Sequence, residues 1–168
     1  MKRLNYRYPL ALAITASIVA GPVSGRSAPE HHLWQDKRTF EAYSKTARSI
    51  TGSIGLSGHR DFATPGSKMT ITFGNGKKIQ LTSLGASWRQ WDDVDNKNVT
   101  AEVFKMARDP GKLLNGNTLC GDGARYIVFH ESISNGNSLL SVAVFDSSKE
   151  PKDIHSPGLC GTFNFFTN

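Results

Sequence analysis

Hydrophobic positions recur at every second residue through most of the chain beyond about residue 50. The alternation is clear in residues 69–73 and again in residues 79–81, and a period of two is typical of strands with one buried face. Between these segments, Gly74-Asn75-Gly76 contains residues that tolerate a positive φ in a tight turn. The sequence therefore predicts a β-hairpin with its turn at Asn75-Gly76.

Further strands are predicted wherever short apolar or alternating runs lie between turn-forming residues. These runs are residues 50–56, 84–91, 99–103, 125–130, 138–146 and 161–166. The run 138–146 is apolar on both faces, which is typical of a strand that is covered on both sides. We therefore expect a mainly β domain of about eight strands, an antiparallel meander arranged as a small barrel or as a sandwich.

One helix is predicted ahead of the strands, over residues 36–47. Phe40, Tyr43 and Ala47 recur at spacings of three and four residues and would form one apolar helix face. Asp36 is a suitable N-cap for that helix.

The first 25 residues have the features of a secretory signal peptide. Lys2, Arg3 and Arg7 precede an apolar run over residues 10–20, and small residues follow it. The apolar run is too short to span a bilayer, which takes roughly 20 residues, although an uncleaved anchor is the alternative. We expect a signal peptide over 1–25, a flexible arm over 26–35 and a single β-rich domain over 36–168, in a periplasmic or secreted protein without a transmembrane segment after cleavage.

The signal peptide accounts for part of the basic character of the chain. The whole sequence has 20 Lys and Arg and 14 Asp and Glu, and three of the basic residues but none of the acidic ones precede residue 26. The mature chain then carries a formal net charge of +3. Such a small excess does not indicate a nucleic-acid partner.

The two cysteines are expected to form a disulfide between Cys120 and Cys160. Disulfides are common in exported proteins, and neither residue lies in a Cys-x-x-Cys motif. A metal-binding pair or two free thiols are the alternatives. Because 40 residues separate them in sequence, the bond would close a long loop.

No motif in the sequence predicts catalysis, a metal site or a cofactor. A nucleophile elbow, a phosphate-binding loop and a metal-binding helix motif are all missing from the sequence, so we predict that the protein is not an enzyme. Trp88 and Trp91 are more informative, because an exposed Trp can stack on a sugar or anchor a protein interface. Packing in the core is the other interpretation of both residues.

Several segments resemble a group of uncharacterised exported proteins of Gram-negative bacteria. They are residues 113–121, which end in Leu119-Cys120-Gly121, the strand end Ala143-Val144-Phe145, and residues 159–163, which begin Leu159-Cys160-Gly161. The resemblance covers most of the mature chain and implies no activity.

A second, shorter segment resembles the periplasmic inhibitors of c-type lysozymes. The segment is Gly123-Ala124-Arg125-Tyr126, followed by an apolar strand and a glycine-bearing turn. The resemblance implies a small antiparallel barrel with a disulfide, which inserts a loop carrying Ser, and a Lys from the next hairpin, into the lysozyme cleft against its carboxylates. Asp122 stands where that family has the start of its Ser-Gly pair, and the turn 134–137 contains no Lys.

Together these features favour a non-enzymatic envelope protein that binds another macromolecule, a protein of the envelope or of the outside of the cell. An inhibitor of a lysozyme or peptidoglycan hydrolase is its most specific form. Because the disulfide would tether the segment after Cys120, we predict that Asp122 and Arg125 contact the partner. The alternatives are a module that binds a glycan or a small ligand through Trp88 and Trp91 or through a barrel mouth, and a hydrolase with an unrecognised site.

Overall fold

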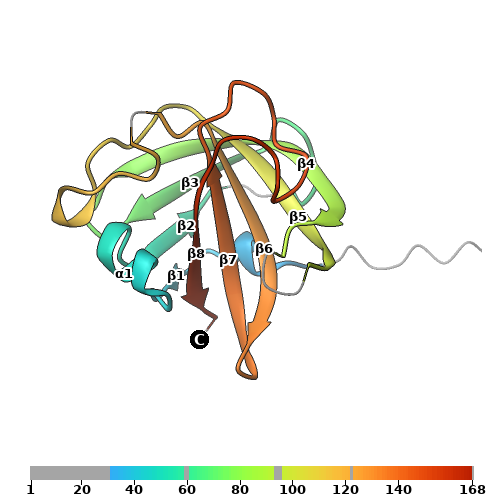
Figure 1. Ribbon diagram of the computed structural model, residues 1–168, viewed down its shortest axis with the longest axis horizontal. Coiled ribbons are helices and arrows are strands. Elements are labelled where there is room, and N and C mark those ends of the chain that lie inside the picture. Colours follow the sequence, from blue (N-terminus) through green and yellow to red (C-terminus); the bar gives the residue numbers. More distant parts are fainter. Residues whose placement is uncertain (1–30, 59–60, 93–95, 122, 168) are drawn as a thin grey trace, which may run out of the picture. The chain divides into compact units, whose positions relative to one another are not determined.

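The protein is mainly β, with one antiparallel sheet of eight strands, as predicted. The structure is a computed structural model that describes residues 31–58, 61–92, 96–121 and 123–167. The sheet follows chain order, so that each strand pairs with the next one along the sequence (Figure 1). The strands are β1 (Thr39–Phe40), β2 (Ile54–Ser57), β3 (Lys68–Phe73), β4 (Lys78–Gln90), β5 (Asn98–Met106), β6 (Tyr126–Ser134), β7 (Asn137–Phe145) and β8 (Leu159–Phe166).

The sheet curves into a barrel. The barrel is open, because no continuous ladder joins the first and last strands of the sheet. The chain just after β1 nevertheless lies along β8, where Ala42 and Phe165 form an isolated bridge. The backbone N–H of Phe166 donates to the carbonyl of Glu41 at 2.8 Å, and the N–H of Tyr43 donates to the carbonyl of Asn164 at 2.8 Å. We call this short contact between residues 41–44 and β8 the seam.

The strand count agrees with the expected number, but several strands differ from the prediction. The run expected over 50–56 is a strand only from Ile54, because Ile50 ends a helix. The segments 79–81 and 84–91 belong to one long strand, β4, which continues through a register shift between Ser83 and Gly85. Gly85 has a φ of 109° there, a conformation that glycine adopts at little cost. The strand that restores the count to eight is β1, which lies in the segment that the sequence assigns to a helix.

The predicted helix over 36–47 is therefore wrong in its position. Residues 39–40 are extended and pair with β2, and helix α1 (Lys45–Ile50) begins only afterwards. Ser44 is the N-cap, since its side-chain oxygen accepts a hydrogen bond from the Ala47 N–H at 3.1 Å. Phe40 is buried in the core, but it lies on strand β1 and not on a helix, so its spacing from Tyr43 and Ala47 does not reflect a helix face.

Part of the expected flexible arm belongs to the folded domain. Residues 33–35 form a 3-10 helix, η1 (Leu33–Gln35), and the Trp34 side chain is only 1% exposed. The expected signal peptide and residues 26–30 lie outside the described residues. A second short 3-10 helix, η2 (Leu114–Gly116), lies in the loop between β5 and β6.

Hydrophobic side chains form two separate cores, one on each face of the sheet. The inner core fills the barrel and includes Phe104, Phe129 and Phe163. The outer core lies on the other face of β5, β6 and β7 and includes Trp91 and Ile154, which come from outside the strands. Strand β7 contributes to both, which explains why its sequence is apolar on both faces.

Candidate functional site

A disulfide joins Cys120 to Cys160, as predicted. The two Cα atoms are 5.1 Å apart, and the bond connects the loop between β5 and β6 to the start of β8. Leu119, next to Cys120, is buried in the inner core. The loop is therefore fixed at this point both by a covalent bond and by packing.

Beside this fixed loop, the end of β5 and the start of β6 border a cleft of about 310 Å³. We call it the basic cleft. Its lining residues are Lys105, Met106, Ala107, Arg108, Asp109, Gly123, Ala124, Arg125, Tyr126 and Ser148.

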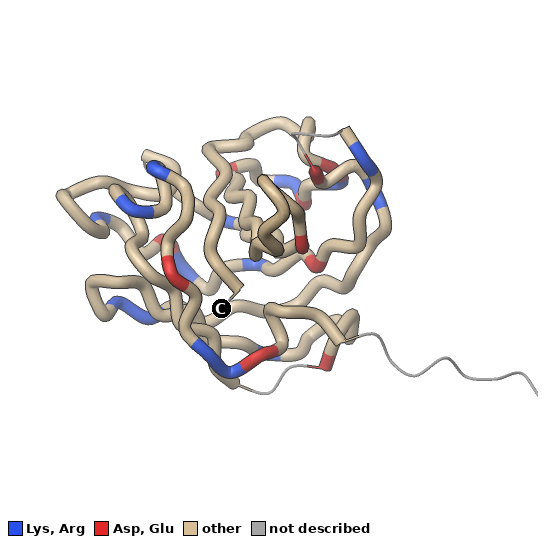
Figure 2. The backbone as a smooth tube through the Cα atoms, turned by 90° about the horizontal axis from the view of Figure 1, so that it is seen from below, with Lys and Arg blue, Asp and Glu red and all other residues tan. Residues whose placement is uncertain are grey.

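Three exposed cations give the basic cleft its charge. Lys105, Arg108 and Arg125 are exposed, and none of them forms an ion pair with another residue in the part of the chain that the structure describes. Elsewhere, Lys and Arg are spread around the domain and interspersed with Asp and Glu (Figure 2). The basic cleft is thus a local concentration of positive charge rather than part of one large basic face.

Among the described residues, Asp109 is the one carboxylate that lines the basic cleft, and it bonds to the backbone. Its two oxygens accept hydrogen bonds from the N–H groups of Gly111 and Ala124, each at 2.5 Å. The bond from Ala124 connects the loop after β5 to the segment before β6, whereas the bond from Gly111 lies within that loop. Asp109 therefore shapes the cleft by joining its two sides.

The backbone of Arg125 is also fixed. Its N–H donates to the carbonyl of Phe145, and its carbonyl accepts from the N–H of Met106, both at 2.8 Å. A cation on such a rigid backbone loses less conformational entropy when it binds a partner than one on a mobile loop. The predicted contact residue Asp122 lies outside the described residues.

Sequence reasoning found Arg125 but missed Lys105 and Arg108. Those two residues lie some twenty positions upstream and belong to no motif. The pairing of Lys105 with Tyr126 in the β5–β6 ladder brings them to the same cleft. Only a prediction of strand register would have found them.

The two candidate tryptophans differ in their surroundings. Trp91 is fully buried in the outer core, donates its indole N–H to the Ser87 hydroxyl at 3.1 Å and packs edge-on against Phe145. Trp88 lies on β4 with 69% of its surface exposed. Of the two, Trp88 is therefore the side chain that a partner can reach directly.

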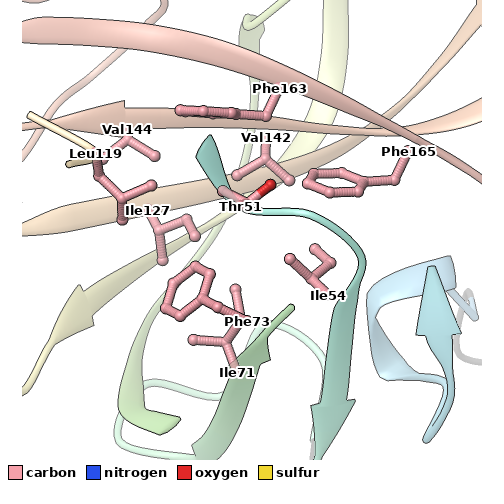
Figure 3. A pocket seen from close by; sticks show the side chains of 10 residues that line it. All are labelled: Thr51, Ile54, Ile71, Phe73, Leu119, Ile127, Val142, Val144, Phe163 and Phe165. Atoms are coloured by element: carbon pink, nitrogen blue, oxygen red, sulfur yellow. The ribbon is translucent and has the colours of Figure 1, made fainter. Parts of the chain in front are cut away.

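The interior of the barrel is filled at the end nearest the disulfide. Ten side chains, all apolar except Thr51, surround a cavity of about 10 Å³ (Figure 3). That volume corresponds to about one water molecule, whereas pockets for small molecules usually measure about 300 Å³ or more. The Phe163 and Phe165 rings occupy much of the space in which a barrel would otherwise hold a ligand.

A buried carboxylate lies elsewhere in the barrel. Glu102 on β5 is 2% exposed and accepts hydrogen bonds from the Trp34 indole N–H at 2.8 Å and from the Ser83 hydroxyl at 2.5 Å. Burial raises the pKa of Glu102, while the hydrogen bonds from Ser83 and Trp34 and from the Ala63 backbone oppose that shift. These donors join η1, β4 and the loop after β2 to one carboxylate.

The Glu102 site contributes a pH-dependent term to stability. Because the pKa is raised in the folded state, the ionised carboxylate disfavours folding, and the penalty disappears as the pH falls through the raised pKa. We expect the unfolding free energy of the wild type to rise relative to that of Glu102→Gln as the pH is lowered from about 8 towards about 4. Urea unfolding of both proteins across that range measures the difference, and Glu41→Gln, at an exposed residue, is the control. Parallel pH profiles for the wild type and Glu102→Gln would contradict the assignment.

Among the described residues, no group of three His, Cys, Asp or Glu side chains could hold a metal ion. No helix in the described ranges has the length and apolar character needed to cross a membrane. No protein-family model matches this chain, and neither does any curated protein or solved structure.

Proposed function

We propose that this protein is an exported envelope protein that binds another macromolecule through the basic cleft. The observation that carries the proposal is the presence of three exposed cations, Lys105, Arg108 and Arg125, in one cleft whose two sides are joined by Asp109. Such an arrangement is complementary to a surface that carries carboxylates. The disulfide supports an oxidising compartment such as the periplasm or the cell exterior.

The most specific form of this proposal is an inhibitor of a lysozyme or another peptidoglycan hydrolase. Glycosidases of this kind work with a pair of carboxyl groups in a cleft. A rigid guanidinium can make charge-assisted, bidentate hydrogen bonds to a carboxylate. Arg125, at the edge of a disulfide-fixed loop, is the group best placed to supply those bonds.

Arg125→Ala tests this proposal. We expect wild-type protein at micromolar concentration to slow peptidoglycan lysis by a c-type lysozyme or a hydrolase of the same envelope, and Arg125→Ala to weaken inhibition roughly a hundredfold. Arg89→Ala, at an exposed Arg on β4 outside the cleft, is the matched control and should inhibit as the wild type does. Equal inhibition by both variants would exclude the basic cleft as the binding surface, and no inhibition of any hydrolase would remove the inhibitor form of the proposal.

A glycan-binding module is the second candidate, and the exposure of Trp88 favours it. An indole that is 69% exposed on a strand can stack on the apolar face of a sugar ring. Binding of peptidoglycan fragments that is lost in Trp88→Ala and retained in Arg125→Ala would favour this candidate over the first.

A further inference from the structure

A second hollow lies on the outer face of strands β1 to β4 and shares no lining residue with the basic cleft. Its volume is about 460 Å³. Thr39, Gly55, Thr72 and Lys78 form one row across the four strands, because each is paired with the next in the ladder. Ile54 and Leu56 face the inner core, so Gly55 between them faces outward. We call this surface the outer hollow.

Gly55 lines the outer hollow, and the fold does not require glycine there. Its φ is outside the left-handed region, and an added Cβ would lie 3.7 Å from Thr72 Cβ and 3.8 Å from Thr39 Oγ1, which are ordinary contact distances. Glycine weakens a strand interior and is often found where a ligand approaches the backbone closely. The missing side chain therefore creates space that packing does not explain.

The other glycines near this surface have structural explanations. A Cβ on Gly74 would lie 3.0 Å from the carbonyl oxygen of Thr51, and Gly76 has a φ of 82° in the β3–β4 turn. Gly55 is thus distinguished from its neighbours by the absence of any such constraint.

The chemistry around Gly55 is that of hydroxyls and cations. Thr39, Ser57 and Thr72 line the outer hollow with Lys37 and Lys78, and Arg38 lies at its edge, 3.3 Å from a carboxylate oxygen of Asp36. Lys37 and Lys78 are exposed and form no ion pair with any described residue. The three large exposed apolar side chains of the described chain, Trp88, Ile133 and Leu159, are not part of this lining.

We infer that the outer hollow is a binding site for an anionic glycan, an oligosaccharide that carries carboxylate or phosphate groups. Hydroxyl side chains exchange hydrogen bonds with sugar hydroxyls, and Lys37 and Lys78 provide charge for the anionic groups. A protein partner would be expected to need an aromatic or apolar anchor, and the described residues that line the outer hollow include no exposed one. Gly55 lets the sugar ring lie against the strand backbone.

The test uses the full chain and oligogalacturonate, a carboxylated glycan, as the probe. We expect calorimetric titration to show salt-sensitive binding of the probe by the wild type. The affinity of Gly55→Thr should be lower by roughly tenfold or more, because the threonine side chain fills space in the outer hollow. The thermal midpoint of Gly55→Thr should be no lower than that of the wild type, since threonine favours strands. Gly161→Thr is the matched control, because Gly161 is also a strand glycine with ordinary room for a Cβ, and it should bind as the wild type does.

Lys37→Glu combined with Lys78→Glu is the second variant, and it provides a test at exposed positions if Gly55→Thr fails to fold. It should also lower the affinity roughly tenfold or more. No binding of oligogalacturonate by the wild type, or unchanged affinity in the folded variants, would overturn the inference. Equal affinity for polyglutamate or for inorganic phosphate would do the same, because the site would then recognise charge without the sugar.

Discussion

Replacement of Cys120 by Ser should lower the thermal midpoint of unfolding by roughly 10–20 °C. The disulfide closes a loop of 40 residues, and a loop of that length stabilises a protein by roughly 4 kcal/mol through its effect on the unfolded chain. For a domain of this size, each kcal/mol corresponds to roughly 2–6 °C. The folded state should also lose order between β5 and β6, because the loop next to Leu119 is no longer tied to β8.

Calorimetry of the oxidised wild type, the reduced wild type and Cys120→Ser measures this effect. The reduced wild type and the variant should unfold at similar temperatures, since both lack the same bond. Cys160→Ser is the matched control. It removes the other half of the disulfide and should lower the thermal midpoint by the same amount. A midpoint within a few degrees of the oxidised wild type in both variants would show that packing alone holds the loop.

Trp91→Ala should have the second large effect, although Trp91 lies outside the barrel. The side chain is fully buried in the outer core, and its indole N–H bonds to Ser87. Truncation of a buried Trp to Ala typically costs about 3–5 kcal/mol, since it removes apolar contacts and leaves a cavity. The Ser87 hydroxyl would also lose its partner.

Trp88→Ala is the natural control, because it removes the same kind of side chain three residues earlier, on strand β4. Trp88 is 69% exposed, and exposed substitutions usually change stability by no more than about 0.5 kcal/mol. Urea unfolding of the two variants should therefore separate them clearly. Equal losses in both would mean that Trp88 packs against a surface in solution.

The strands were predictable from the sequence because their side-chain period is two. The Asn75-Gly76 hairpin is confirmed, with Gly76 in the positive φ that the turn requires. The two-sided character of residues 138–146 is confirmed as well, because β7 faces both cores. These features depend on nearby residues, so sequence spacing alone identifies them.

The wrong prediction of a helix over 36–47 shows where residue spacing no longer identifies secondary structure. Phe40 and Ala47 have helical spacing, but Phe40 is buried from a strand and Ala47 from a helix. Residues 39–44 are extended because β2 and β8 supply backbone partners, and β8 lies far along the chain. The basic cleft depends in the same way on the β5–β6 register, so sequence analysis singles out only Arg125 among its three cations.

The seam has a consequence for the timing of folding. Residues 41–44 bond to residues 164–166, so the last strand of the chain completes contacts with one of the first. The same strand carries Cys160. Neither the seam nor the disulfide can form until the chain has emerged through β8, and contacts between such distant segments form slowly. The domain therefore completes its fold only after β8 has been synthesised.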